Sequence, residues 1–376
     1  MPVVEILEKL VAIPSVSSMS NFALLDAIAA MLEPRGWFTV RQAYIAADGI
    51  EKANMLAVPE RFKDALQHVE LLFVCHTDTV PYQPGWADAT HLREVDGQLH
   101  GCGACDVKGA MAGMLAAAFE TDPTALHAPV AYAFTAEEEI GCIGATRLVA
   151  SGRIHPRRVI VCEPTSLHPA TAGKGYGLAE VRVRGHEAHS AFPAQGVSAI
   201  HVAAQLIASL ERKLAVGGVA DALFTPPHTT ANVGVIHGGT AKNILAGSCE
   251  FLFEWRAVPG EDPRRGGEVL KRVAEEMAAK SRCVIEVDVK RADGGFRNAA
   301  SVRLGAALER LLARPQTGIS FGSEATRFAA LAEEAVVIGP GNMETAHSER
   351  ECVPVAELEE WTATVRELLQ HGVPLT

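Results

Sequence analysis

Four short runs of hydrophobic residues along this chain contain almost no polar position. They cover residues 71–75, 130–136, 159–162 and 335–338. Continuous runs of this length are typical of strands that are buried on both faces, as in a parallel sheet. Stretches with a helical pattern alternate with them, at residues 21–32, 108–119 and 142–150. The alternation predicts an α/β domain with a mixed, mostly parallel sheet and helices on both of its faces.

A segment with a different rhythm begins after three glycines at residues 173–177. Its strands and helices follow the order β-α-β-β-α-β, at residues 178–184, 197–214, 230–236, 244–255, 263–280 and 284–289. This order is that of the ferredoxin-like fold. The strands alternate only partly between hydrophobic and polar residues, which indicates a sheet that helices cover on one side. The sequence therefore predicts a second domain of the α+β class.

The chain returns to the first pattern after the glycines at residues 294–295. A helical stretch at residues 301–312 and the last hydrophobic run follow them. We therefore expect one domain made of residues 1–176 and 290–376, into which residues 177–289 are inserted. The glycine clusters at the two junctions are the expected hinges.

Histidines and acidic residues follow each of the four hydrophobic runs. They are His76 and Asp78 after the first run, Glu137, Glu138 and Glu139 after the second, Glu163 after the third and His347 after the fourth. In open α/β sheets the ligand crevice lies outside the carboxyl ends of the strands, so we expect these side chains to converge. Asp106 precedes a predicted helix, and its two carboxylate oxygens allow it to bridge two cations. Imidazole and carboxylate ligands indicate a site for zinc, cobalt or manganese rather than for haem or an iron–sulfur cluster.

The three adjacent carboxylates at residues 137–139 repel one another unless cations or protons compensate their charge. A charge run of this kind is commonly a solvent-exposed face. Its position directly after a buried run favours instead a site in which one carboxylate binds a metal and its neighbour takes a proton from water. Asp78 is expected to support His76, because a carboxylate near a ligating histidine can accept the hydrogen of the other ring nitrogen.

Composition narrows the class of partner. The 376 residues are 48% hydrophobic and carry a formal net charge of −11, which argues against nucleic acid or an anionic membrane as a partner. No apolar stretch reaches the ~18 residues that a membrane span needs, and the first ten residues lack the pattern of a secretion signal. The eight cysteines are scattered, as expected of reduced thiols. We expect a cytoplasmic protein without disulfides that acts on a small molecule.

Five segments together resemble the motif series of the M20 metallopeptidases. They are HTDTVP from His76, GACDVKG from Gly103, AEEEIG from Ala136, CEPT from Cys162 and the pair Ala346 and His347. The segments occur in the order of the family and span almost the whole chain. The resemblance implies a zinc-peptidase-type α/β fold with an inserted lid and dimerisation domain. It also implies amidohydrolase activity with two zinc ions, for which cobalt is a substitute.

The resemblance assigns roles to individual residues of this chain. The metal ligands that it implies are Asp106 as the bridge, His76 and Glu163 for one zinc ion, and Glu139 and His347 for the other. Glu138 would be the general base that activates water, and Asp78 would act beside the ligand His76.

Three residues of the inserted segment also match family positions. His189, in the stretch GHEAHSAFP from Gly185, would reach across a homodimer to the active site of the partner subunit and stabilise the oxyanion. Asn243 and Arg256 would hold the substrate, and a bidentate guanidinium suits a substrate carboxylate.

The substrate is indicated by residues 321–326 and 339–347, which most resemble the acetylornithine deacetylase branch of the family. This implies hydrolysis of N-acyl amino acids, in the first place N-acetyl ones, and a place in arginine biosynthesis. A succinyl-diaminopimelate desuccinylase and a glutamate-type carboxypeptidase or dipeptidase are alternatives within the family. An alternative of another class is a catalytically silent protein that binds metal or an acyl amino acid, although all five ligands and Glu138 are present. Cys102 and Cys105 form a Cys-x-x-Cys pair that alone would indicate redox or zinc chemistry, but no second pair accompanies it.

Overall fold

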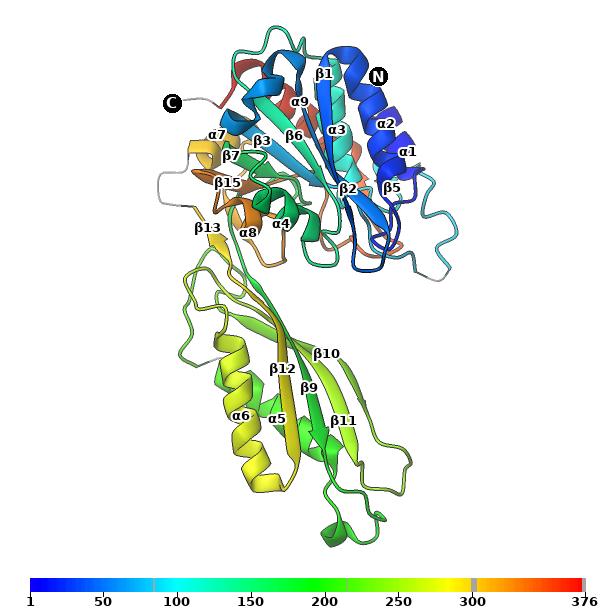
Figure 1. Ribbon diagram of the computed structural model, residues 1–376, viewed down its shortest axis with the longest axis vertical. Helices are drawn as coiled ribbons and strands as arrows, with labels where there is room; N and C mark the ends of the chain where they lie inside the picture. The colour runs from blue at the N-terminus through cyan, green and yellow to red at the C-terminus, as the bar shows by residue number, and fades with distance from the viewer. Residues whose placement is uncertain (84, 215, 299–302, 374–376) are drawn as a thin grey trace. The chain divides into compact units, whose positions relative to one another are not determined.

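The computed structural model describes residues 1–83, 85–214, 216–298 and 303–373. The chain divides into two compact units, which Figure 1 shows in the colours of the chain order. The first unit comprises Met1–Thr171, Asn298–Thr317 and Ser323–Thr376. The second unit comprises Ala172–Arg297 and Gly318–Gly322.

Four parallel strands form the middle of a nine-stranded sheet. In order across the sheet they are β6 (Val130–Thr135), β3 (Val69–His76), β7 (Pro156–Val161) and β15 (Glu334–Val337). Every residue of β6 and β15 is buried. The four hydrophobic runs coincide with these four strands, and three of the runs extend one residue beyond their strands. The prediction of a buried parallel core is therefore confirmed. Because the strands are parallel, their carboxyl ends lie at one edge of the sheet.

Antiparallel strands flank this parallel group on both sides, so the sheet is mixed. Next to β6 it continues into β2 (Glu51–Pro59) and β1 (Trp37–Ile45), which form a hairpin. Next to β15 it continues into β8 (Ala170–Gly173), with which β13 (Phe296–Arg297) and β14 (Thr317–Ile319) pair. The hydrophobic runs do not predict these strands, because β1 is partly exposed and β13 has only two residues.

A separate three-stranded sheet consists of β16 (Cys352–Pro354), β5 (Gln98–His100) and β4 (Arg93–Val95). Cys352 pairs with His100 in this sheet. Because Asp106 follows β5 and His347 precedes β16, the small sheet ties together the two segments that carry these candidate ligands.

Helices cover both faces of the central sheet (Figure 1). On one face the helices that share a hydrophobic core with the strands are α1 (Val3–Val11), α2 (Phe22–Leu32), α3 (Lys108–Phe119), α7 (Arg303–Leu312) and α9 (Val355–His371). On the other face lie α4 (Ile143–Ala150) and α8 (Ala325–Phe328). Three short 3-10 helices are η1 (Glu33–Arg35), η2 (Glu60–His68) and η3 (Pro193–Gln195). The expected fold class is therefore confirmed.

The predicted helix boundaries are close to those of the structure. The helix expected at residues 108–119 is α3, and α2 and α4 each begin one residue after their expected starts. The helix expected at residues 301–312 is α7, and residues 301 and 302 lie outside the described part of the chain. Among the described residues, no helix combines the length and the hydrophobicity that crossing a membrane requires.

α3 is the central helix of the first unit. All but the last of its twelve residues are buried, and it packs between α1 and α9. A Cβ atom at Gly113 would lie 2.5 Å from the ring of Trp361 on α9, so a larger residue cannot take its place without a shift of the helices. This close packing explains why a stretch rich in glycine, alanine and methionine leads from Asp106 into the core.

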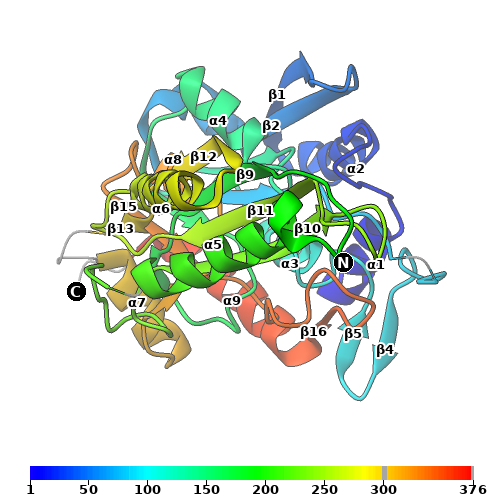
Figure 2. The same cartoon turned by 90° about the horizontal axis from the view of Figure 1, so that it is seen from below.

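The second unit has the ferredoxin-like arrangement. Its elements in chain order are β9 (Tyr176–Arg184), α5 (Ala199–Leu214), β10 (Thr230–Gly238), β11 (Ser248–Arg256), α6 (Arg265–Ser281) and β12 (Val284–Asp293). The strands pair antiparallel in the order β10-β11-β9-β12, and α5 and α6 lie side by side on one face (Figure 2). Hydrophobic strand residues such as Val181 and Phe253 belong to the core with these helices. On the other face Arg182 forms ion pairs with Glu180 and Glu250, so the prediction of a sheet covered on one side is confirmed.

The glycine clusters have a packing role within the second unit. A Cβ atom at Gly175 would lie 2.2 Å from the carbonyl oxygen of Asp293. A Cβ atom at Gly177 would lie 1.9 Å from the ring of Trp255. These glycines are therefore required by close contacts, and their role as hinges stays a prediction.

Candidate metal centre

The carboxyl ends of the central strands bring the predicted ligands together. His76 is the last residue of β3, Glu139 lies in the turn after β6, and Glu163 lies two residues after β7. His347 lies in the loop that follows β15, and Asp106 lies just before α3. Because neighbouring parallel strands end at the same edge, residues separated by up to 271 positions in sequence become neighbours in space.

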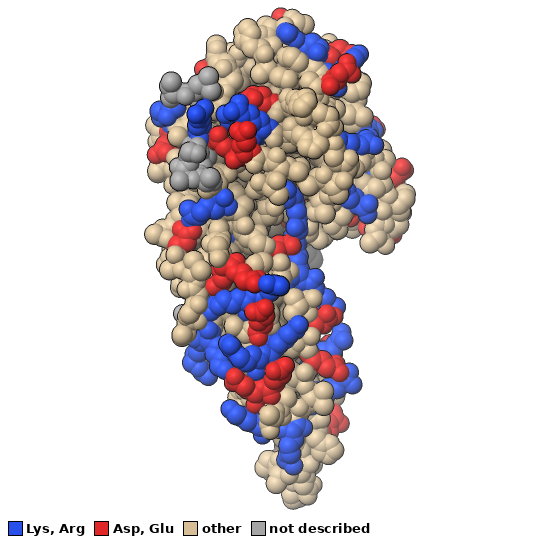
Figure 3. Space-filling model, turned by 60° about the vertical axis from the view of Figure 1, so that its left-hand side comes forward, with Lys and Arg blue, Asp and Glu red and all other residues tan. Residues whose placement is uncertain are grey.

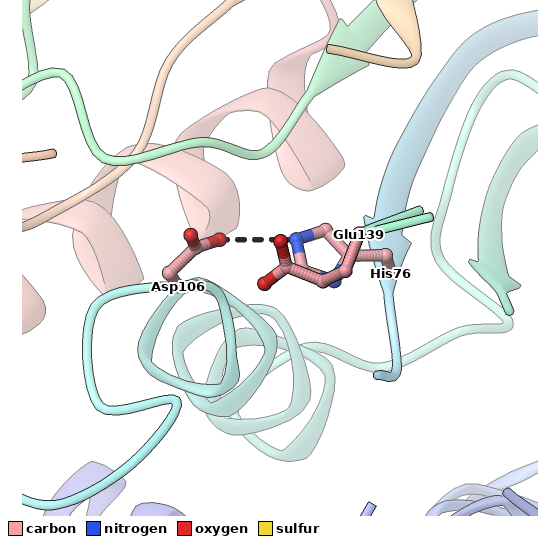
Figure 4. A group of neighbouring side chains, drawn as sticks. All are labelled: His76, Asp106 and Glu139. Carbon is pink, nitrogen blue, oxygen red and sulfur yellow. Dashed lines mark hydrogen bonds and ion pairs between the residues drawn. The ribbon is translucent and has the colours of Figure 1, made fainter. Parts of the chain in front are cut away.

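Asp106 lies between the two histidines. Its Oδ1 is 3.0 Å from Nε2 of His76, and its Oδ2 is 3.1 Å from Nε2 of His347. Nε2 of His347 is also 3.1 Å from Oε2 of Glu139. Figure 4 shows the side chains of His76, Asp106 and Glu139 turned toward one another, and ligand atoms of these three residues lie within 4.8 Å of each other. Each oxygen of Asp106 therefore faces a different histidine, as a carboxylate that bridges two cations must.

Glu163 is buried beside this group and has an unpaired carboxylate oxygen. The residue is only 2% exposed, and its Oε1 has no hydrogen-bond partner among the described residues. Burial, followed by the charge of Asp106, raises the pKa of Glu163 well above its usual value. A buried carboxylate without a partner is costly, so its position fits a ligand for a cation.

Hydrogen bonds between the histidines and carboxylates of the cluster shift the pKa values of these groups. Burial alone would lower the pKa of His76, but the hydrogen bond with Asp106 and nearby carboxylates raise it well above its usual value. Hydrogen bonds with Asp106 and Glu139 raise the pKa of His347 to about 10. Burial alone would raise the pKa of Asp106, but its hydrogen bonds with His347 and His76 lower that pKa below its usual value. Any divalent cation that binds here must displace these protons, and the nitrogen and oxygen donors fit zinc, cobalt or manganese.

Glu138 lies next to the cluster of His76, Asp106 and Glu139. It is not part of that cluster in the described residues. Burial is the largest cause that raises its pKa, to about 8, and the charges of Glu139 and Glu324 add to it while His76 opposes it. The thiol of Cys142 donates a hydrogen bond of 3.3 Å to Oε1 of Glu138. A carboxyl group whose pKa lies near neutrality can both take and return a proton at neutral pH.

Asp78 differs from the expectation. We expected its carboxylate to accept the N–H of His76, but Nδ1 of His76 lies 2.9 Å from the backbone carbonyl of Asp78 and 3.8 Å from its carboxylate. The carboxylate instead accepts the backbone N–H groups of Glu138 at 3.0 Å and of Glu139 at 3.2 Å. The carboxylate of Asp78 thus holds the backbone of the acidic turn, while its backbone carbonyl lies nearest to the ring of His76.

Two further buried carboxyl groups, those of Glu351 and Glu324, lie at the centre and were not predicted from the sequence. Oε1 of Glu351 accepts the backbone N–H groups of Cys105 and Asp106, each at 3.1 Å. Glu324 is fully buried, and neither of its carboxylate oxygens has a hydrogen-bond partner among the described residues. Burial raises the pKa of both groups to about 7. The only available signals were the distance of four residues from His347 to Glu351 and the position of Glu324 within residues 321–326.

The three predicted residues of the inserted segment lie in the second unit. His189 is exposed, and its Nδ1 accepts the backbone N–H of Ala191 at 3.1 Å. The carbonyl of Asn243 accepts the backbone N–H of Ser190 at 2.9 Å, so the loops of His189 and Asn243 are neighbours. Arg256 is the last residue of β11, whereas the loop of Asn243 precedes the first residue of that strand.

The guanidinium of Arg256 stacks on an aromatic ring. It lies 4.4 Å from the centre of the ring of Tyr176, and its Nη2 is 3.5 Å from Oε2 of Glu254. About a quarter of its side chain is exposed, at 27%. The stacking fixes the plane of the guanidinium and leaves part of it open to a ligand.

Comparisons with known proteins agree with this geometry. The family model described as peptidase family M20/M25/M40 matches residues 72–371. A protein of Myxococcus xanthus named acetylornithine deacetylase is 40% identical over 369 residues, which cover 97% of this chain and 96% of that protein. The crystal structure of a tripeptidase from Staphylococcus aureus covers 99% of this chain and 98% of its own with a TM-score of 0.82 and 21% identity. A Bacillus subtilis structure described as a dinuclear metal-binding peptidase of the M20 family covers 98% of each chain with a TM-score of 0.67 and 15% identity.

Proposed function

This chain belongs to peptidase family M20/M25/M40, and on that premise we propose that it hydrolyses the amide bond of N-acyl amino acids in a metal-dependent reaction. N-acetyl amino acids are the proposed substrate class, with acetylornithine first among them, because the Myxococcus relative at 40% identity is named for that reaction. The observation that carries the proposal is the position of Asp106, with one oxygen toward each of two histidines.

The proposed cofactor is a pair of zinc ions, with cobalt as a substitute. Asp106 would bridge the ions, and the remaining ligands would be His76 and Glu163 on one side and Glu139 and His347 on the other. Bound at this place, the ions would supply Lewis acidity, which lowers the pKa of water and polarises a carbonyl group. The name of the Bacillus structure supports two metals rather than one, as does the unpaired oxygen of Glu163.

Glu138 is the proposed general base. Its carboxylate would take a proton from water and later return it to the leaving amine, as its pKa near neutrality allows. Asp78 supports this role from the backbone, because it holds the N–H groups of Glu138 and of the ligand Glu139. The spacing of base and ligand is thereby fixed within one turn.

The second unit is proposed to be an inserted lid and dimerisation domain. Arg256 would hold the substrate carboxylate by a bidentate interaction, and Asn243 would assist it. His189 would stabilise the oxyanion in the active site of the other subunit of a homodimer. The exposure of His189 agrees with a residue that acts outside its own unit.

The surface of the second unit supports the proposed dimer. Large hydrophobic side chains are exposed at Phe192, Val235, Ile236 and Ile244. Val235 and Ile236 lie on β10, one of the two edge strands of the four-stranded sheet, where unpaired backbone groups can bind a second strand. Elsewhere the surface of this unit mixes Lys and Arg with Asp and Glu, as the face in Figure 3 shows. We propose a cytoplasmic location, which the scattered positions of the eight cysteines support.

The test is the release of free amine from a panel of N-acetyl amino acids, N-succinyl amino acids and Xaa-Glu dipeptides. The protein is assayed with zinc, with cobalt and with a chelator. Chelator-sensitive cleavage of N-acetylornithine is the expected result. Preference for succinyl or dipeptide substrates would indicate the desuccinylase or carboxypeptidase alternatives. Silence across the panel with metal bound would contradict the proposal and favour a binding protein.

A further inference from the structure

A buried lysine lies beside the acidic turn. Lys52, on β2, is 1% exposed, and its Nζ lies 3.2 Å from Oε1 of Glu137. The hydroxyl of Tyr44 donates a hydrogen bond of 2.9 Å to the other oxygen of the same carboxylate. Glu137 itself is 3% exposed, so both oxygens of a buried carboxylate are held from the hairpin of β1 and β2.

Lys52 is also linked through Ser17 to Asp78, which holds the backbone of the proposed base Glu138. Its Nζ donates a hydrogen bond to the backbone carbonyl of Ser17. The hydroxyl of Ser17 donates a hydrogen bond of 2.7 Å to Oδ2 of Asp78. Asp78 in turn accepts the N–H groups of Glu138 and Glu139. The ammonium group of Lys52 therefore contacts Glu137 directly and is linked to Asp78 through Ser17.

The backbone of the turn needs such support. Glu137 has a φ angle of 60°, which places a residue with a Cβ atom in the left-handed region. Conformations of this kind persist where the surroundings determine them and are common at functional sites. The carboxylate of Glu137 is held by Lys52 and Tyr44, and Asp78 accepts the backbone N–H groups of Glu138 and Glu139. The direction of the Glu138 side chain therefore depends on these contacts.

Charge gives a second reason for the lysine. Three adjacent carboxylates repel one another, and the metal centre compensates only those that face it. The carboxylate of Glu137 contacts Lys52 and Tyr44, and a buried carboxylate needs an opposite charge with good hydrogen bonds. Lys52 supplies the opposite charge and one hydrogen bond, and Tyr44 supplies the other hydrogen bond.

We propose that Lys52 is a positioning residue of the reaction: it fixes the turn at residues 137–139 through Glu137 and through Ser17, and thereby sets the direction of the base Glu138. Tyr44 assists it at Glu137. This inference rests on the proposed function of Glu138, but its structural part can be measured without turnover.

The experiment compares zinc-loaded wild type with Lys52→Met, Lys52→Arg, Tyr44→Phe and Lys63→Met. Lys63→Met is the matched control, because Lys63 pairs with Glu60 at 2.8 Å on the surface. Two quantities are measured for each protein: kcat and KM on the best substrate of the panel, and amide hydrogen exchange of the peptide that covers residues 136–144.

Lys52→Met is expected to lower kcat by about 10- to 100-fold with KM within about threefold, because small errors in the position of a catalytic group are costly. Amide exchange of Glu138 and Glu139 should accelerate by about tenfold or more. Lys52→Arg should recover part of kcat, Tyr44→Phe should lower it by a few-fold, and Lys63→Met should match the wild type. A general loss of packing would accelerate exchange throughout the first unit, and arginine would not restore kcat.

Wild-type exchange at residues 136–144 in Lys52→Met would overturn the proposal, as would wild-type kcat in that variant. If Lys52→Met does not fold, Tyr44→Phe decides: exchange accelerated only in this peptide supports the proposal, and unchanged exchange contradicts it. If the wild type cleaves no substrate, the proposed function fails separately, while the exchange result still tests the positioning.

Discussion

The two units hold their candidate residues in different ways. In the first unit the side chains of the metal centre meet one another: Asp106 contacts both His76 and His347 within 3.1 Å. In the second unit His189 and Asn243 are exposed on neighbouring loops. Among the described residues of that unit, their side chains do not share a contact. A site that is complete within one unit can thus be identified from its own geometry, whereas residues that act on a neighbour need a measurement of function.

The loss of turnover should be greatest when the proposed base beside the candidate metal centre of the first unit is replaced. Glu138→Gln should reduce kcat by ~10³-fold or more, since the amide cannot accept a proton. Zinc content should stay at the wild-type value, because Glu138 is not among the proposed ligands. Turnover kinetics and metal analysis of the same preparation measure the two quantities. Glu60→Gln, at an exposed carboxylate, is the control, and activity near that of the wild type in Glu138→Gln would refute the base assignment.

The next effect tests the exposed loop of the second unit. His189→Ala should reduce kcat by ~100-fold, because one donor to a developing oxyanion is lost. His201→Ala, which changes an exposed histidine on α5, should have no effect. Mixing His189→Ala with Glu138→Gln subunits should restore part of the activity if the histidine acts across the dimer. Unchanged kcat in His189→Ala would remove this residue from the mechanism.

A smaller effect is expected at Arg256. Arg256→Lys keeps the charge but loses the planar fork, so KM should rise roughly tenfold with little change in kcat. Steady-state kinetics with Arg264→Lys as the control measures this, because Arg264 pairs with Asp262 on the surface of the same unit. A fall in kcat without a change in KM would place Arg256 outside the binding of the substrate.

The smallest effect concerns pH. In the metal-free protein the pKa of Glu138 is about 8 and the pKa values of Glu324 and Glu351 are about 7, all above the ordinary value of 4.5. The folded state therefore keeps protons that the unfolded chain has released, and the free energy of unfolding falls as pH rises from about 4.5 to 8. His347, whose pKa is raised to about 10, acts in the same direction, because its stabilisation is complete below pH 6.5 and is lost as pH rises toward 10.

Thermal unfolding of chelator-treated protein at pH 5.5, 7 and 8.5 measures this effect. The midpoint should fall by about 3 °C or more over the range. With excess zinc the fall should disappear, since cations compete better with protons at higher pH. A midpoint that rises with pH in the chelated protein would contradict these pKa shifts.

Part of the site follows from the sequence by a simple physical route. A buried strand is recognisable from an unbroken hydrophobic run, and parallel strands end at one edge, so the positions of His76, Glu139 and Glu163 were predictable. The same reasoning from hydrophobic runs does not predict the roles of Lys52 or Glu351. Lys52 stands in a strand of mixed composition, and its burial depends on Glu137, which is 85 positions away.

The detailed contacts were also beyond the sequence. The carboxylate of Asp78 lies 3.8 Å from Nδ1 of His76 and accepts the backbone N–H groups of Glu138 and Glu139 at 3.0 and 3.2 Å, and a motif does not encode this difference. The edge strands β1 and β13 escaped the same analysis, because partial exposure and short length remove the hydrophobic signal.

A zinc titration of the chelator-treated protein tests directly whether Asp106 holds a pair of metal ions. Bound metal is measured by calorimetry while cleavage of N-acetylornithine is followed in parallel, for the wild type and for Asp106→Asn. The proposed zinc centre predicts two bound zinc ions per chain, activity that appears as they bind, and loss of both high-affinity binding and turnover in Asp106→Asn. Full turnover without metal, or wild-type metal binding and turnover in Asp106→Asn, would contradict it.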